Sequence, residues 1–160
     1  DGSVLWLLAD NDTARENMQR EADQAGVARE RLVFAPRVPP AEYLARFQLA
    51  DLVLDTFPYN AGTTASDALW MGVPILTRSG RTYISRMAGS LLTAVGLPDL
   101  ITDSLDEYEC QAVRLGREPA RVASYKRYLA EHGRGSPLFD LPLLVRDIET
   151  EFERLALAHR

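Results

Sequence analysis

Hydrophobic positions along the chain alternate between short apolar runs and longer stretches with helical spacing. The short runs cover residues 4–8, 31–36, 52–55, 73–77 and 100–103, and the helical stretches cover residues 11–25, 39–50, 65–71, 82–96, 105–116, 119–131 and 141–158. Short apolar runs bounded by turn residues are typical of buried parallel strands. The alternation predicts an α/β fold with a largely parallel sheet flanked by helices, followed by C-terminal helices.

Residues at the ends of these stretches support the assignment. Asn11 or Asp12 can cap the first helix, and Gly26 follows it as a terminating glycine does. The last stretch is amphipathic, with its apolar face formed by Leu144, Ile148, Phe152 and Leu155. The glycine-rich segment of residues 132–140 precedes it and is predicted to be a flexible joint.

Bulk properties narrow the class of protein. A length of 160 residues predicts a single domain, here residues 1–160. A formal net charge of −5 argues against a nucleic-acid or anionic membrane surface, although a local basic pocket for a small anion is compatible with it. The single cysteine, Cys110, excludes an internal disulfide and suits a cytoplasmic protein. The first residue is not Met and a strand pattern follows at once, so we expect a piece of a longer chain.

Three strand exits carry the residues that suit a ligand site: residues 35–40, 56–64 and 77–82. They contain Gly, Pro, Thr or Arg. In open α/β sheets, ligands bind at the carboxyl ends of the strands beside helix N-termini. We therefore expect the three exits to line one edge of the sheet.

The second of these exits contains the turn Gly62-Thr63-Thr64, followed by Asp67. The first N–H groups of a helix lack partners within the helix and lie at the positive end of its dipole. With two hydroxyl donors they can hold a phosphate or diphosphate, and a carboxylate one turn later can accept hydrogen bonds from a ribose. The alternative is an ordinary helix start, with Thr63 or Thr64 as the cap and Asp67 completing a capping box.

A longer string around this turn resembles the C-terminal catalytic domain of O-linked N-acetylglucosamine transferases, including bacterial relatives fused to tetratricopeptide repeats. The string is "DLVLDTFPYNAGTTASDALWMGVPILT" followed by "SGRTYISRMAGSLLTAVGLPDLI", and the likeness extends over about residues 4–140. The resemblance implies a GT-B fold, in which two Rossmann-like halves hold a uridine-diphosphate (UDP) sugar mainly through the C-terminal half. This chain would be that half.

The resemblance also implies roles for single residues. Thr63 and Thr64 would contact the diphosphate and Asp67 the ribose. Asn60 occupies the position of the family's Asn ahead of the turn, and Arg46 matches an Arg on the preceding helix.

Three positions depart from the family pattern. Gly62 stands where a His usually precedes the threonines, Tyr43 where a His lies near the uracil, and Pro40 where a Lys is expected. Tyr43 can still stack on a base. The loss of a His and a Lys removes two donors to the nucleotide or its phosphates.

The implied function is transfer of a sugar, N-acetylglucosamine for the parent family, from a UDP-sugar to a Ser or Thr hydroxyl of a polypeptide. We expect no metal and no cofactor, because the sequence has no metal-ligand cluster and these enzymes resemble metal-independent inverting transferases that stabilise the leaving diphosphate with helix dipoles and side-chain donors. The acceptor-side N-terminal half and the helical repeats would be partners within the parent protein, so the chain alone should be inactive. The sequence does not assign a catalytic residue. The alternatives are a degenerate protein-interaction module, and another GT-B enzyme such as a UDP-sugar epimerase.

Overall fold

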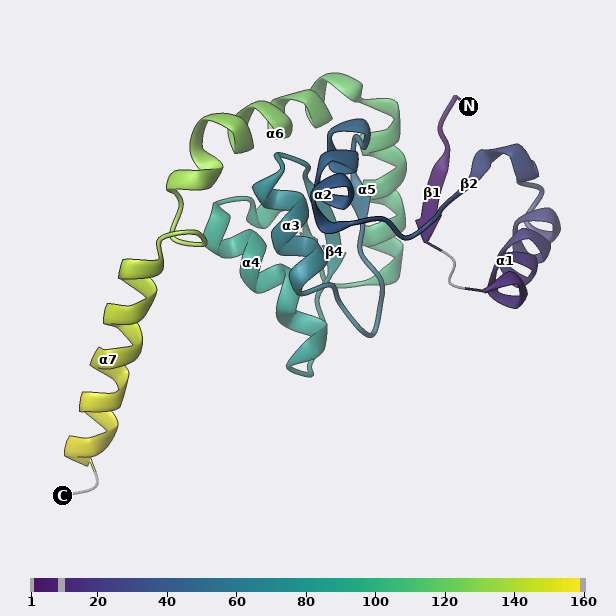
Figure 1. Cartoon of the computed structure of the whole chain (residues 1–160). Helices are drawn as coiled ribbons and strands as arrows, with labels where there is room; N and C mark the ends of the chain where they lie inside the picture. Colours follow the sequence, from purple (N-terminus) through teal and green to yellow (C-terminus); the bar gives the residue numbers. More distant parts are fainter. Residues whose placement is uncertain (1, 9–10, 159–160) are drawn as a thin grey trace. The chain divides into compact units, whose positions relative to one another are not determined.

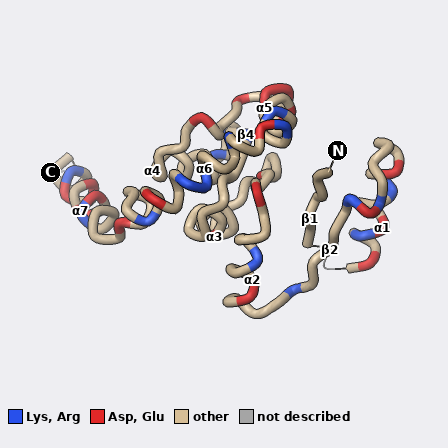
Figure 2. Tube along the Cα trace, turned by 90° about the horizontal axis from the view of Figure 1, so that it is seen from above, with Lys and Arg blue, Asp and Glu red and all other residues tan. Residues whose placement is uncertain are grey.

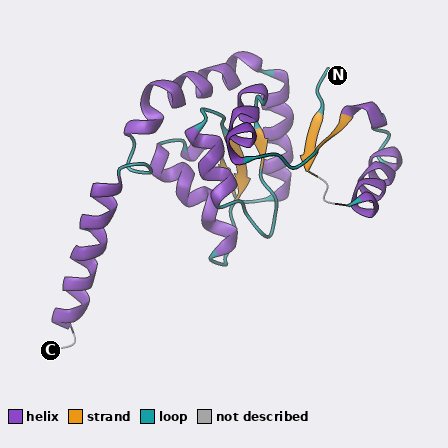
Figure 3. Ribbon diagram, viewed as in Figure 1, coloured by secondary structure: helices purple, strands orange, loops and turns teal. Residues whose placement is uncertain are grey.

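The computed structural model describes residues 2–8 and 11–158. The chain divides into two compact units, one ending at Tyr43 and the other beginning at Leu44. Strands and helices alternate in both units, and every strand pair is parallel (Figures 1 and 3). The α/β class with parallel strands flanked by helices is thus confirmed.

The first unit contains a two-stranded parallel sheet. Strand β1 (Leu5–Leu8) pairs with β2 (Leu32–Ala35) in the register Leu5 to Leu32, and helix α1 (Asp12–Gln24) and the 3-10 helix η1 (Arg29–Arg31) connect them. The α1 helix begins as expected, because the Asn11 side chain accepts a hydrogen bond of 2.7 Å from the Ala14 N–H.

Burial in this unit is lower than the sequence predicts. The Leu5, Trp6 and Leu8 side chains of β1 are exposed, and α1 buries none of its residues. The prediction of a buried strand is therefore wrong for β1. The physical reason is that this unit contains only two short strands and one polar α-helix within its own described residues. These elements provide too little apolar surface to cover both faces of the strands.

The second unit holds a three-stranded parallel sheet in the order β3-β4-β5. Its strands are β3 (Val53–Leu54), β4 (Ile75–Arg78) and β5 (Ile101–Thr102). Its α-helices are α3 (Thr63–Trp70), α4 (Met87–Val95), α5 (Leu105–Arg117), α6 (Pro119–His132) and α7 (Leu141–Ala158). The 3-10 helices are η2 (Phe47–Leu49), η3 (Ile84–Arg86), η4 (Pro98–Leu100) and η5 (Gly133–Gly135). Helix α2 (Pro40–Arg46) runs across the boundary between the units.

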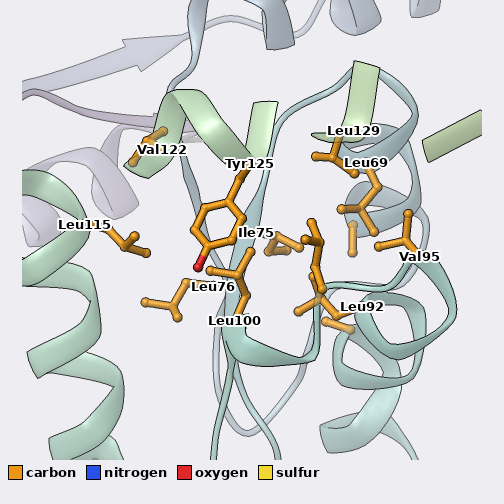
Figure 4. Packing of buried hydrophobic residues seen from close by; sticks show 13 residues of the cluster. Leu69, Ile75, Leu76, Leu92, Val95, Leu100, Leu115, Val122, Tyr125 and Leu129 are labelled. Carbon is orange, nitrogen blue, oxygen red and sulfur yellow. The ribbon is translucent and has the colours of Figure 1, made fainter. Parts of the chain in front are cut away.

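The core of the second unit forms around β4, the central strand. Ile75 and Leu76 are fully buried, as expected for a strand covered on both faces. Helices α3 to α6 contribute the surrounding side chains (Figure 4). The labelled members of this cluster are Leu69, Ile75, Leu76, Leu92, Val95, Leu100, Leu115, Val122, Tyr125 and Leu129. This core fixes both β4 and the helix α3 that precedes it.

The C-terminal helix α7 has the predicted amphipathic character but buries none of its residues. Leu144, Ile148 and Phe152 are exposed, and the charged residues of the helix are four acidic residues between Arg146 and Arg154 (Figure 2). In the preceding segment, the Ser136 hydroxyl donates a hydrogen bond to the Gly133 carbonyl and Asp140 accepts one from the Leu143 N–H. The flexibility of residues 132–140 stays a prediction. Among the described residues, no helix combines the length and the apolar character needed to cross a membrane.

Candidate functional site

The Gly-Thr-Thr turn lies at the start of α3, in the loop that follows β3. Gly62 is the N-cap residue of α3, and Thr63 and Thr64 are its first two residues. Among the described residues no side chain caps this helix, so the alternative in which Thr63 or Thr64 forms an ordinary cap is wrong. Both threonines are exposed. The helix therefore presents uncapped N–H groups and two accessible hydroxyls at the positive end of its dipole.

Asp67 lies one turn into α3 and is partly exposed. It is four residues after Thr63 and three after Thr64, and residues at these spacings are neighbours on a helix surface. Its carboxylate has no hydrogen-bond or ion-pair partner among the described residues. Thr63, Thr64 and Asp67 are therefore neighbours on the surface at the start of α3. Their contacts with a ligand stay a prediction.

Asn60 is fully buried, and its amide group is bound by the protein itself. Its Nδ2 donates hydrogen bonds to the Thr56 carbonyl at 2.8 Å and to the Arg78 carbonyl at 3.3 Å. Its Oδ1 atom is buried and has no hydrogen-bond partner within the described part of the chain. Asn60 therefore links the loop after β3 to the end of β4.

The exit of β4 lies beside this loop. The Arg78 guanidinium stacks over the Phe57 ring at 3.8 Å from its centroid. Gly80 donates its N–H to the Ser85 carbonyl at 2.8 Å, and the Ser85 hydroxyl accepts from the Thr82 N–H at 3.0 Å. These contacts fold residues 78–85 into a compact turn next to Phe57.

The other expected ligand residues are divided between the units. Arg46 is partly buried and belongs to the same unit as the Gly62–Thr64 turn, whereas Tyr43 ends the first unit. The β2 exit also belongs to the first unit. Of the three strand exits expected at one sheet edge, those after β3 and β4 are adjacent in one sheet, and the third belongs to the other sheet.

Asp55, the residue that follows β3, had no role predicted from the sequence. Its carboxylate is 8% exposed and accepts hydrogen bonds from the Thr56 N–H at 2.9 Å, the Ala61 N–H at 2.8 Å and the Thr77 hydroxyl at 2.6 Å. The Tyr108 hydroxyl donates to the Asp55 backbone carbonyl at 2.9 Å. The sequence did contain a signal for such a role, because Asp55 directly follows an apolar strand and begins the loop that leads to the Gly62–Thr64 turn.

Burial changes the pKa of the Asp55 carboxyl group and of the neighbouring Tyr108 hydroxyl. Desolvation raises the pKa of Asp55, and the hydrogen bonds from Thr77, Ala61 and Thr56 offset part of that effect. Burial, together with the nearby Asp55 charge, raises the pKa of Tyr108 to about 12. The Asp55 carboxyl group and the Tyr108 hydroxyl are thus both partly shielded from water.

Comparison with known proteins decides the family. The sequence matches the profile of glycosyl transferase family 41 over residues 1–148. The chain belongs to this family.

Similar proteins of known name agree with this assignment. The chain is 35% identical over 147 residues to the UDP-N-acetylglucosamine–peptide N-acetylglucosaminyltransferase of Caenorhabditis elegans, covering 92% of this chain and 13% of that protein. It is 33% identical over 158 residues to the probable transferase SEC of Arabidopsis thaliana, covering 98% of this chain and 16% of that protein. The chain thus spans a small part of the length of these relatives.

A solved structure gives the same result for the fold. A mutant of the Thermobaculum terrenum O-GlcNAc transferase matches with a TM-score of 0.85 at 31% identity, covering 94% of this chain and 30% of that one. The resemblance to the C-terminal part of O-GlcNAc transferases and the GT-B-type α/β fold are thereby confirmed.

Proposed function

We propose that this chain is the donor-binding half of an inverting glycosyltransferase that transfers N-acetylglucosamine from UDP-N-acetylglucosamine to a Ser or Thr hydroxyl of a protein. The observation that carries the proposal is the uncapped N-terminus of α3, with the exposed Thr63 and Thr64 hydroxyls, in a member of glycosyl transferase family 41. The names of the relatives, which specify peptide N-acetylglucosaminyltransfer, support the donor and the acceptor class.

In this proposal, the start of α3 binds the diphosphate of the donor. Backbone N–H groups and the hydroxyls of Thr63 and Thr64 donate to phosphate oxygens, and the helix dipole favours their negative charge. Negative charge grows on the diphosphate as the bond to the sugar breaks. Donors held in place before the reaction therefore stabilise the transition state more than the ground state.

The remaining residues bind or shape the nucleotide part of the site. Asp67 accepts hydrogen bonds from ribose hydroxyls, Tyr43 stacks on the uracil and Arg46 contributes a positive charge. Asn60 and Gly62 set the backbone path that leads into the turn, with Gly62 allowing close approach of the phosphates. The acceptor polypeptide is bound by the N-terminal half of a complete transferase, and we propose a cytoplasmic location for that protein.

Calorimetric titration of UDP into the chain tests the donor site. Wild-type protein should bind UDP, and the double variant Thr63→Ala/Thr64→Ala should bind it more weakly by roughly 1–3 kcal/mol, the scale of hydrogen bonds to a charged group. The matched control is Thr93→Ala/Thr150→Ala, which removes two hydroxyls that donate within α4 and α7. The control should leave UDP affinity unchanged.

The same experiment separates the alternatives. An absence of UDP binding to the chain and to the complete protein would contradict the proposal and favour a degenerate interaction module, in which Gly62, Tyr43 and Pro40 have replaced the side chains that donor binding needs. Binding to the complete protein, with conversion of the free sugar nucleotide and no acceptor, would favour an epimerase. Transfer of the sugar to a polypeptide would support the transferase.

A further inference from the structure

The carboxylate of Asp55 closes the loop that leads into the Gly62–Thr64 turn. Its Oδ1 atom accepts hydrogen bonds from the Thr56 N–H at 2.9 Å and from the Ala61 N–H at 2.8 Å. One oxygen atom thereby joins the first and last residues of a six-residue segment, and Ala61 directly precedes the N-cap residue of α3. This atom therefore ties the start of the loop to the residue that precedes the helix.

The second oxygen connects the loop to the sheet. The Asp55 Oδ2 atom accepts from the Thr77 hydroxyl at 2.6 Å, and Thr77 is a fully buried residue of β4. The loop has further ties that do not use the carboxylate, since Asn60 bonds the Thr56 and Arg78 carbonyls and Tyr108 bonds the Asp55 carbonyl. The carboxylate differs from these other ties because it binds the Ala61 N–H, next to the start of α3.

We propose that Asp55 is a positioning residue of the donor site, which holds the Gly62–Thr64 turn in its diphosphate-binding conformation through the Thr56 and Ala61 N–H groups without contacting the donor. This proposal rests on the function proposed above. The Asp55 side chain is 8% exposed and accepts three hydrogen bonds within the protein, so little of it is accessible to a ligand. An anionic ligand would also be repelled by a bare carboxylate in direct contact.

The chemistry of the side chain predicts which substitutions preserve the role. Asn offers one oxygen that can accept from both N–H groups and an NH₂ group that can donate to the Thr77 hydroxyl oxygen. Ala offers no acceptor and leaves both N–H groups unpaired. Glu keeps the charge, but its extra methylene moves the oxygens away from the positions that both N–H groups require.

The test measures UDP affinity by calorimetry in four variants. Asp55→Ala and Asp55→Glu should weaken UDP binding by about tenfold or more. Asp55→Asn should retain affinity within about threefold of the wild type. Thr77→Val removes only the bond to Oδ2, and it should lower stability while also keeping affinity within about threefold.

Thr77→Val is the control for a merely structural role, because it removes a hydrogen bond from the same carboxylate but not the one that closes the loop. If Thr77→Val and Asp55→Ala weaken binding equally for equal losses of stability, Asp55 acts through global stability and the proposal is wrong. Asp55→Glu keeps the test decisive if Asp55→Ala does not fold. Unchanged UDP affinity in a folded Asp55→Ala or Asp55→Glu variant would also overturn it.

Amide hydrogen exchange distinguishes failure of this proposal from failure of the proposed function. The Ala61 amide should be protected in the wild type, Asp55→Asn and Thr77→Val, and should exchange faster in Asp55→Ala. If this pattern holds and the wild type binds no UDP, the loop is closed as described but the turn is not a donor site. If Ala61 exchanges at the same rate in Asp55→Ala as in the wild type, the loop-closing role itself is refuted.

Discussion

The Tyr108 hydroxyl donates a hydrogen bond of 2.9 Å to the backbone carbonyl of Asp55, joining residues 53 positions apart in the sequence. Tyr108 lies on α5 and Asp55 follows β3, so this bond ties a distant helix to the loop that precedes the candidate donor turn. The Tyr108 ring packs at the edge of the main core cluster. The Tyr108 side chain thus holds the loop through the backbone, independently of the Asp55 carboxylate.

Replacing Tyr108 by Phe should lower stability without changing the packing of the ring. The substitution leaves the Asp55 carbonyl without this donor, and the expected loss in the free energy of unfolding is about 1 kcal/mol. Urea denaturation at pH 7 measures it. Tyr59→Phe is the matched control, because Tyr59 is 71% exposed and its loss should leave the urea midpoint unchanged. Equal midpoints for Tyr108→Phe and wild type would show that the bond contributes nothing.

The raised pKa of Asp55 should make stability fall as pH rises. Burial disfavours the charged form in the folded state, so the folded chain binds the proton more tightly than the unfolded chain does. The stabilising contribution of the protonated group is complete below the ordinary pKa of 3.8 and is lost as pH rises through the folded-state pKa. Urea midpoints at several pH values should therefore change less with pH in Asp55→Asn over that window. An identical pH profile in the two proteins would contradict the assigned shift.

Two glycines near the candidate site should differ in their tolerance of substitution by Ala. A Cβ at Gly80 would lie 2.5 Å from the Ser85 Oγ and 2.8 Å from the Ser85 Cβ, closer than Cβ atoms approach other heavy atoms, and in tight contact with the Phe57 Cε2 at 3.2 Å. A Cβ at Gly62 would meet only Met87, at an ordinary 3.5 Å. Gly80→Ala should therefore destabilise the chain by about 1–3 kcal/mol, as overpacking does, while Gly62→Ala should stay within about 1 kcal/mol of the wild type. Thermal unfolding distinguishes the two, and a reversed order would refute this packing argument.

Removal of α7 should leave the rest of the second unit folded. This helix buries none of its residues, so its deletion takes little apolar surface out of the core. A chain ending at Asp140 should unfold with a free energy within about 0.5 kcal/mol of the full chain, the range of changes outside packed regions. Near-ultraviolet circular dichroism during urea unfolding follows Trp70, which lies outside α7 and packs edge-on against Phe139. A large drop in the urea midpoint would reveal packing of α7 on the core.

The sequence predicted the order and type of the elements well, because their hydrophobic spacing is a local property. The turn before α3 was also accessible to prediction, since a glycine, two threonines and a carboxylate one turn later are adjacent in the chain. The helix expected over residues 82–96 instead begins with a 3-10 turn, where Thr82 and Ser85 exchange side-chain and backbone hydrogen bonds. Such bonds compete with helix formation and are hard to weigh from composition.

Contacts between distant residues account for what the sequence did not predict. Asp55 has no role until Ala61, Thr77 and Tyr108, which lie 6, 22 and 53 residues later, meet it in the folded chain. The same applies to Asn60, which matched a family position as a ligand residue but bonds carbonyls of the loop and of β4. Division into two sheets depends on which strands pair, and hydrophobic spacing carries no information on pairing.

The Asp67 carboxylate should contribute to binding the nucleoside part of the donor but not to binding its phosphates. It lies one turn beyond Thr63 and Thr64 on the same side of α3, so a diphosphate at the helix start would put the ribose, not the phosphates, near its carboxylate. Asp67→Ala should weaken UDP binding by about 1–2 kcal/mol, the loss expected for hydrogen bonds to a charged acceptor. It should leave the affinity for inorganic pyrophosphate unchanged or slightly higher, because a nearby negative charge is removed. Calorimetry with both ligands measures the difference, and Thr63→Ala/Thr64→Ala, which should weaken both, is the comparison. An equal loss for UDP and pyrophosphate in Asp67→Ala would mean that Asp67 shapes the helix start and does not bind the ribose.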